Sequence, residues 1–203
     1  MSKPFSEACE NNKAPILAII SKYFKPGKKI LEIGSYTTQH VQYFAEKMPE
    51  VYWQPSDISE NVPIMLAGLE DAQRDNIRQP VSLDVCDERW SVTKADGIFS
   101  ANTLHIMPES RMPRFFHGAG AILAPHGYLC VYGPFKYGGD FTSESNARFD
   151  SWLKIQDADS GIRDFEQADA LASNAGLALI ADHAMPANNQ LLVWQKMLNY
   201  FPV

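Results

Sequence analysis

The sequence predicts an α/β protein with a doubly wound sheet that is mostly parallel and ends in an antiparallel hairpin. An apolar run at residues 30–33 leads into Gly34 and a short polar loop, after which apolar residues recur at helical spacing. Four more strand-like segments alternate with helical patterns, which is typical of successive strand–helix–strand units. Two final strand-like segments, residues 177–184 and 190–196, are five residues apart, a link too short for a parallel crossover.

The other elements follow from local patterns. A first helix is predicted over residues 14–23, with Pro15 in its first turn and Lys25-Pro26-Gly27 as its end. The second strand, residues 51–57, contains Pro55, which is unusual inside a sheet. Further strands are predicted at residues 81–84, 97–101 and 128–132, and further helices at residues 62–75, 108–123, 146–154 and 165–175. Five strands and the two of the hairpin make a seven-stranded sheet.

Composition excludes several classes of protein. The net charge of −6 and the absence of a Lys/Arg run argue against a nucleic-acid partner. The N-terminus has no apolar signal region, and no apolar run approaches the ~20 residues of a membrane span. Cys9, Cys86 and Cys130 are too far apart to indicate a zinc site or a disulfide framework. We expect a cytoplasmic protein with no metal and no membrane partner.

Carboxylates stand at the ends of three successive predicted strands, namely Glu32, Asp57 and Asp84. The carboxyl ends of parallel strands are where ligands bind in open α/β sheets. A carboxylate before a single glycine suits a ligand with an ammonium or sulfonium group and would repel a phosphate. Without a G-x-G-x-x-G loop, an NAD-dependent oxidoreductase is disfavoured, although it shares the acid after the second strand. Asp84 could also serve only an Asx-turn or a helix cap.

The layout resembles the class I S-adenosylmethionine-dependent methyltransferases, which have a Rossmann-like seven-stranded sheet with a C-terminal hairpin. More narrowly, the chain is similar to a small uncharacterised methyltransferase-like family, a domain of unknown function, found in bacteria and animals. The matching stretches are residues 30–35, 39–40, 56–57, 102–105, 132–135, 143–146, 149–150, 161–164 and 185–189. The resemblance covers nearly the whole chain and implies one domain over residues 1–203.

The resemblance implies S-adenosylmethionine as the cofactor, bound over the loop at Gly34. Glu32 would lie beneath the methionine moiety, Asp57 would accept from both ribose hydroxyls, and Asp84 would hold the adenine amine. The complete set of expected cofactor contacts is Asn12, Glu32, Gly34, Ser35, Thr37, Asp57, Ile58, Asp84, Val85 and Asn102. Residues 1–13 are polar and could be disordered or could fold over the site as a lid. His40 is expected to make a structural polar contact.

A small-molecule methyl acceptor is expected to enter between residues 102–105 and an insertion at residues 132–165. His105 could act as a general base, since an imidazole titrates near physiological pH, or it could be a packed histidine satisfied by backbone. Methyl transfer depends mostly on alignment, so a base need not be required. The expected substrate contacts are His105, Tyr132, Phe135, Asn146, Arg163 and Asn188.

Two of these predictions have structural alternatives. Arg163 could hold a carboxylate or phosphate of the substrate by a bidentate contact, or it could pair internally with Asp150 or Asp164. Trp152, at helical spacing from Phe149, is expected to belong to the ordinary core rather than to a substrate wall.

Tyr36 and Thr38 stand where the resembling family usually has glycine. Glycine reaches positive φ freely, whereas another residue held there costs about 1–3 kcal/mol. Two functions are therefore carried forward. The first is an S-adenosylmethionine-dependent methyltransferase acting on a small molecule. The second is a non-catalytic methyltransferase-fold protein whose degenerate loop binds another ligand or a protein partner. The methyl acceptor, the methylated atom and the oligomeric state are not predicted.

Overall fold

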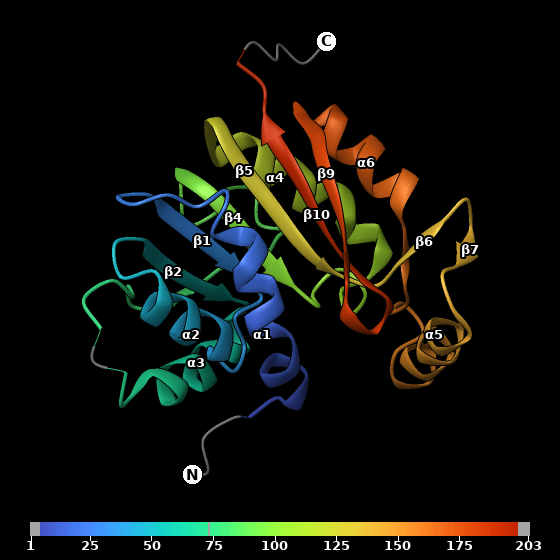
Figure 1. Ribbon diagram of the computed structural model, residues 1–203, viewed down its shortest axis with the longest axis horizontal. Coiled ribbons are helices and arrows are strands. Elements are labelled where there is room, and N and C mark those ends of the chain that lie inside the picture. Colours follow the sequence, from blue (N-terminus) through green and yellow to red (C-terminus); the bar gives the residue numbers. More distant parts are fainter. Residues whose placement is uncertain (1–4, 73, 199–203) are drawn as a thin grey trace.

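The computed structural model describes residues 5–72 and 74–198, which form a seven-stranded sheet between layers of helices (Figure 1). The strand order is β3-β2-β1-β4-β5-β10-β9. Every pair is parallel except those of β10, which runs antiparallel to both β5 and β9. The strands are β1 (Lys29–Ile33), β2 (Tyr52–Asp57), β3 (Val81–Ser82), β4 (Ala95–Ala101), β5 (Leu123–Gly133), β9 (Leu177–Met185) and β10 (Asn189–Lys196). The predicted fold class is confirmed.

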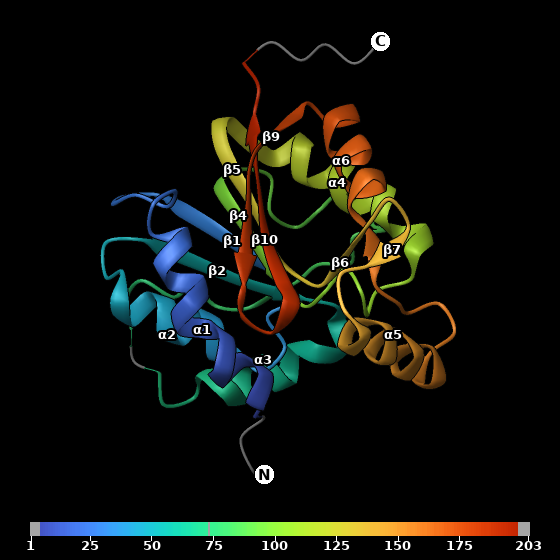
Figure 2. The same ribbon diagram turned by 45° about the vertical axis from the view of Figure 1, so that its right-hand side comes forward.

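Helices cover both faces of the sheet, as the turned view shows (Figure 2). Helices α1 and α2 bury apolar residues with Phe44, Trp53 and Phe99 on one face. Helices α4 and α6 pack on the other face, where Phe116 meets Trp194 edge to face. The helices are α1 (Glu7–Ile20), α2 (Gln39–Lys47), α3 (Val62–Leu69), α4 (Met112–Ile122), α5 (Glu144–Gln156) and α6 (Phe165–Asn174), with 3₁₀ turns η1 (Ser59–Asn61), η2 (Glu109–Arg111) and η3 (Pro186–Asn188). None of the helices in the described ranges is long and apolar enough to cross a membrane.

A second, three-stranded sheet was not predicted. It has the order β7-β6-β8 and is built from β6 (Phe135–Tyr137), β7 (Asp140–Phe141) and β8 (Arg163–Asp164). These strands are two or three residues long, too short to leave a periodic pattern in the sequence. They enclose α5, so that residues 135–164 form a unit beside the carboxyl end of β5 (Figure 1).

Helix α1 begins seven residues earlier than predicted. Ser6 caps it by accepting from the backbone N–H of Cys9, and Glu7 and Glu10 favour the positive end of the helix dipole. Pro15 therefore lies inside the helix and removes one helical hydrogen bond. Part of the predicted lid, residues 1–4, lies outside the described residues.

Other boundaries differ from the prediction as well. Helix α3 ends at Leu69, and the expected extension to residue 75 includes Gln73, which lies outside the described residues. Strand β3 has only two residues. Strand β5 begins at Leu123, so the Pro125-His126-Gly127 segment that was predicted to end a helix lies within the strand, with His126 at a φ of 62°.

Candidate functional site

The direction of winding reverses between β1 and β4, which lie side by side at the centre of the sheet. Ligands of doubly wound sheets bind outside the carboxyl ends of the strands at such a switch point. Glu32 and the loop after Ile33 stand at this edge, and Asp57 ends the neighbouring strand β2. The two acids that the sequence analysis placed at adjacent strand ends are therefore neighbours in space.

The Glu32 carboxylate is buried, with a side chain only 2% exposed. Ser35 Oγ donates to one of its oxygens over 2.7 Å, and no other described residue donates a hydrogen bond to the carboxylate. Burial raises the pKa of Glu32 to about 7, assisted by the charge of Asp57 and opposed by the Ser35 bond. A positively charged group beside this carboxylate would favour its ionised form.

Gly34 turns the chain away from β1 at a φ of 82°, and the site leaves no room for a side chain. A Cβ at this position would lie 2.3 Å from Thr103 Oγ1, on the loop after β4. The N–H groups of Gly34 and Ser35 both donate to the carbonyl of Ser56 over 3.0 Å. The turn is thus fastened to β2 on one side and closed by the β4 loop on the other.

Tyr36 and Thr38 adopt positive φ values of 35° and 62°. The loop therefore follows the path that would suit glycine and does not re-route around the two substitutions. Thr38 is fully buried, and its Oγ1 donates to the Thr37 carbonyl (2.6 Å) and accepts from Gln42 (2.9 Å). Tyr36 is 50% exposed, and its contact with the site is the bond from its backbone N–H to Asp57 Oδ2 (2.9 Å).

Asp57 organises the loops on either side of it. Its Oδ1 accepts from the N–H of Ile58 (2.8 Å) and from Asn61 Nδ2 (2.9 Å), while Oδ2 accepts from Tyr36. A carboxylate has about four acceptor positions, so about one remains here. Accepting from both ribose hydroxyls would require Asp57 to give up one present bond. Ile58 is 37% exposed beside it.

Asp84 forms the Asx-turn that was its structural alternative, because its Oδ1 accepts from the N–H of Cys86 (2.8 Å). Its other oxygen lies 3.6 Å from Arg111. Val85 is buried, and its carbonyl accepts from the indole of Trp90 over 3.4 Å. Both residues therefore have structural partners within the part of the chain that the structure describes.

Asn12 joins α1 to the sheet through a buried polar cluster. Its Oδ1 accepts from His40 Nε2 over 2.6 Å, and its side chain also bonds the hydroxyl of Tyr132. His40 stacks on Phe44, and burial lowers the pKa of His40 to about 4, so the ring is neutral. His40 makes a structural contact, as expected. The Asn12 and Tyr132 side chains, predicted to bind cofactor and substrate, bond each other.

The first turns of α1 lie against the loop that follows β1. The Gln39 side chain bonds both the N–H and the carbonyl of Ser6, and it also donates to Glu10 over 2.7 Å. The thiol of Cys9 bonds Thr37, which is buried. The described part of the predicted lid is therefore a helix fastened to the loop.

His105 lies on the loop after β4 with only 5% of its side chain exposed. Its ring meets Phe149 of α5 edge to face at 5.4 Å, and its Nδ1 is 3.4 Å from the position of a Cβ on Gly133. No described residue bonds either ring nitrogen, and neither nitrogen is completely buried. His105 is therefore packed, as its structural alternative expected, but no backbone group among the described residues bonds its ring. Asn102 begins the same loop at a φ of 57° and donates to the Tyr132 carbonyl.

Other predicted substrate contacts lie elsewhere. Phe135 is buried in the core with α4 and α6, so it is not part of a substrate wall. Asn146 donates to the carbonyl of Asn188 over 3.0 Å, a contact that joins α5 to the β9–β10 turn. Trp152 was expected in the core, but it is 54% exposed and stacks on Phe149, the ring that also contacts His105.

Arg163 is not available to a substrate anion. Its guanidinium donates to the backbone carbonyls of Leu104 (2.9 Å), Met107 and Asp159 (2.8 Å) and lies 3.5 Å from Glu109. The internal ion pair that was its structural alternative is formed, but with Glu109 in place of Asp150 or Asp164. A sequence cannot show that the carbonyls of Leu104 and Met107, more than 50 residues away, will take up two of these donors.

Sequence analysis missed Ser56, Asn61 and Thr103, which fix the loops around Gly34 and Asp57. A signal for two of them was present. Ser56 is a polar residue within a predicted strand, and Thr103 lies two residues after the end of another predicted strand.

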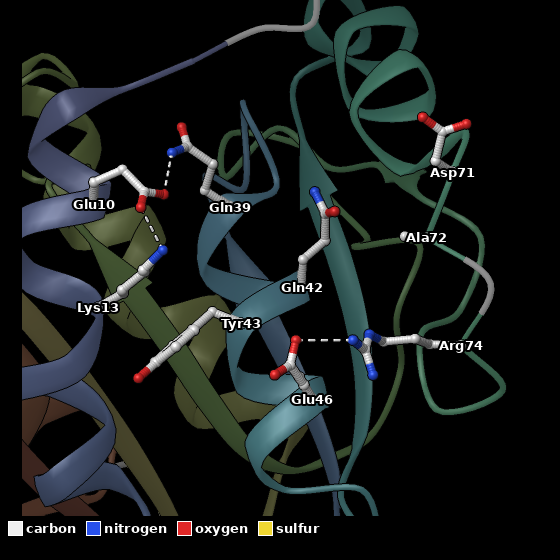
Figure 3. Close-up of a pocket in the computed structure, with 9 residues that line it drawn as sticks. All are labelled: Glu10, Lys13, Gln39, Gln42, Tyr43, Glu46, Asp71, Ala72 and Arg74. Carbon is white, nitrogen blue, oxygen red and sulfur yellow. Dashed lines mark hydrogen bonds and ion pairs between the residues drawn. The ribbon is translucent and has the colours of Figure 1, made fainter.

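A groove of about 550 Å³ lies along the outer flank of α2 (Figure 3). Four of its charged side chains pair with one another, Glu10 with Lys13 and Glu46 with Arg74. It contains none of the strand-end acids, so it is distinct from the predicted cofactor site. Its lining is Glu10, Lys13, Gln39, Gln42, Tyr43, Glu46, Asp71, Ala72 and Arg74.

We compared the chain with known protein families. Residues 3–196 match the family described as "Protein of unknown function (DUF938)". The chain belongs to the DUF938 family. The match covers the whole seven-stranded sheet and the insertion.

Solved structures share the fold at low sequence identity. An O-methyltransferase family protein from Burkholderia thailandensis superposes with a TM-score of 0.81 at 14% identity, over 94% of this chain and 58% of that one. Human N-acetylserotonin methyltransferase, solved with SAM, gives 0.79 at 15% identity, over 95% and 53%. A putative sarcosine dimethylglycine methyltransferase from Galdieria sulphuraria gives 0.71 at 14% identity, over 94% and 86%. The chain thus spans little more than half of the first two, and its fold is that of class I methyltransferases.

Replacing Gly34 by alanine is expected to lower the free energy of unfolding by about 1–3 kcal/mol, because the new Cβ meets Thr103 Oγ1 at positive φ. Urea denaturation measures this. Gly138→Ala is the matched control, since Gly138 also has positive φ but opens onto free space. Equal losses at the two positions would contradict a steric role for Thr103.

Tyr36→Gly is expected to be more stable than Tyr36→Ala by about 1 kcal/mol, since both remove the exposed ring but only glycine relieves the positive φ. Thermal and urea unfolding of the two variants check this difference. If the alanine variant is as stable as the glycine variant, the loop carries no strain at this position.

Proposed function

We propose that this protein is an S-adenosylmethionine-dependent methyltransferase acting on a small molecule. The observation that carries the proposal is the buried Glu32 carboxylate at the switch point, whose single hydrogen-bond donor among the described residues is Ser35. Burying a carboxylate costs several kcal/mol unless a cation or further donors offset it. S-adenosylmethionine carries both an ammonium and a sulfonium group, and either would supply that offset.

Glu32, the loop at residues 34–38 and Asp57 are the residues that would hold the cofactor. Asp57 keeps about one free acceptor position for a ribose hydroxyl. The half-exposed Ile58 offers an apolar contact to a flat base. When bound, the cofactor supplies an electrophilic methyl group on sulfur. The shared fold of human N-acetylserotonin methyltransferase, solved with SAM, supports this choice of cofactor.

His105 is proposed to take the proton that the methyl acceptor loses. Its imidazole is neutral at pH 7, because burial and then the charge of Arg163 lower its pKa to about 4. A hydroxyl becomes strongly acidic as a methyl group bonds to its oxygen, so a weak base is sufficient for an oxygen acceptor. The proton then moves from the acceptor heteroatom to a ring nitrogen of His105, which has no partner among the described residues.

The neighbouring elements have proposed roles as well. Helix α1, fastened over the loop by Gln39, is proposed as the lid on the cofactor side. The insertion at residues 132–165 is proposed as the wall on the acceptor side, since its Phe149 packs against His105. A net charge of −6 without a basic stripe supports a small-molecule acceptor over a nucleic acid.

A second candidate is a non-catalytic protein that binds another cationic ligand at Glu32. The positive φ of Tyr36 and Thr38 favours it, because side chains there crowd a loop that a cofactor must approach closely. Restoring glycine at both positions distinguishes the candidates. A non-catalytic protein would gain cofactor binding that the native chain lacks, whereas an active enzyme would already bind.

Calorimetric titration with S-adenosylmethionine is expected to show binding that tightens as the pH rises. A cationic ligand favours ionised Glu32, and the pKa of about 7 in the free protein means that a proton must leave below that pH. The association constant is expected to rise by up to about tenfold per pH unit below pH 7 and to level off above it. Absence of heat at millimolar ligand, with folded protein, would overturn the proposal.

Glu32→Gln is expected to stabilise the free protein at pH 8 while removing cofactor binding. In the folded protein the pKa of Glu32 is about 7, above the value of 4.5 expected without burial. The free energy of unfolding of the native protein therefore falls as the pH rises from 4.5 to 7, because the buried side chain becomes ionised. The cost is on the order of 3 kcal/mol, measured as urea unfolding at pH 5 and pH 8. Glu60→Gln, at an exposed acid, is the control. A variant that binds cofactor normally would count against the role of Glu32.

A further inference from the structure

Four successive backbone carbonyls, those of residues 104–107, all accept hydrogen bonds from residues 160–163. Arg163 Nε donates to Leu104, and the N–H of Gly161 donates to His105 over 2.8 Å. Ser160 Oγ donates to Ile106 over 2.7 Å, and a second nitrogen of Arg163 donates to Met107. Two segments more than 50 residues apart are therefore joined at every position of the loop that carries His105.

Residues 104–107 belong to no helix or strand of the described chain. The loop lies between β4 and the turn η2, and its own bonds run from the N–H groups of Ile106 and Met107 back to Thr103. A buried carbonyl without a donor costs about 1–3 kcal/mol, so the four donors determine which conformation the loop can hold. The orientation of the His105 ring follows from the conformation of this loop.

The donor segment is itself held in place by α5. Asp150 Oδ1 accepts from the N–H of Ile162 over 2.8 Å, and its other oxygen bonds Lys154. A Cβ on Gly161 would lie 3.0 Å from Asp150 Oδ1, so the chain passes as close to α5 as a glycine permits. Arg163 is 5% exposed, and the carboxylate of Glu109 balances its charge.

We propose that Arg163 is the positioning residue for His105, holding the 104–107 loop so that the imidazole stands between Gly133 and Phe149 toward the methyl acceptor. This inference rests on the proposed function, because it is the methyl acceptor that His105 would face. Arg163 has a second effect through its charge, which disfavours a proton on the nearby ring. Both effects keep a neutral imidazole in one orientation.

The two effects can be separated by two substitutions. Arg163→Gln removes both the positive charge and the guanidinium, which donates to several carbonyls at once. Arg163→Lys keeps the charge but loses that planar set of N–H donors. In Arg163→Gln the pKa of His105, followed by NMR of the imidazole, is expected to rise from about 4. Hydrogen exchange at the Ile106 and Met107 amides is expected to accelerate by about tenfold or more. In Arg163→Lys the exchange is expected to accelerate while the pKa of His105 stays low.

Arg148→Gln is the matched control, since it removes an exposed arginine of the same insertion that pairs only with Glu144 among described residues. It should leave both readouts unchanged. Ser160→Ala removes one donor without altering charge, so it should accelerate exchange at the loop and keep the His105 pKa low even if Arg163→Gln fails to fold. Native exchange rates in Ser160→Ala and Arg163→Lys would overturn the inference.

These readouts need no cofactor and no turnover. If the wild-type protein transfers no methyl group, the proposed function fails, and exchange and titration still show whether Arg163 fixes the loop. If the wild-type protein is active, kcat in Arg163→Lys should fall with little change in the KM for S-adenosylmethionine, because the cofactor loop is untouched.

Discussion

A carboxylate buried at the end of the central strand is the constraint on which the rest of the site depends. Glu32 lies under a turn that is bonded to β2 through Ser56 and closed against the β4 loop by Thr103. Ser56 and Thr103 therefore fix the position of the turn above the carboxylate. The acid is left with one donor, and a cation is the chemical complement of that arrangement.

The positive φ values in the loop after β1 and the burial of Glu32 both show side chains held in unfavourable states by their surroundings. The side chain of Thr38 bonds Thr37 and Gln42. These bonds offset the conformational free energy that its backbone pays for a positive φ. Residues at the site are thus fixed in unfavourable states by the packing around them. Such preorganisation is typical of sites in which a ligand, rather than the protein, completes the interactions.

The fold and the edge of the sheet that carries the site could be predicted, because both follow from periodicity and from acids at strand ends. Glu32 and Asp57 lie where that reasoning placed them. Contacts between distant segments could not be predicted in the same way. The donors of Arg163 go to carbonyls, which every residue has, so no sequence signal marks them. Trp152 has the spacing of a core residue, yet it stacks on Phe149 with half of its surface exposed, and spacing alone does not show which of two neighbouring aromatic residues is buried.

The insertion is fastened at both of its inner corners, by Asn146 to the β9–β10 turn and by residues 160–163 to the His105 loop. Its outer corner is the Gly138-Gly139 turn between β6 and β7, where added atoms would meet nothing within 4 Å. The N–H groups of Gly138 and Gly139 nevertheless donate to the carboxylates of Glu166 and Asp164, so side chains hold this turn although it faces open space. In mechanical terms, a segment held at three corners resists rotation about any one of them, and the insertion is expected to move with the sheet as one body.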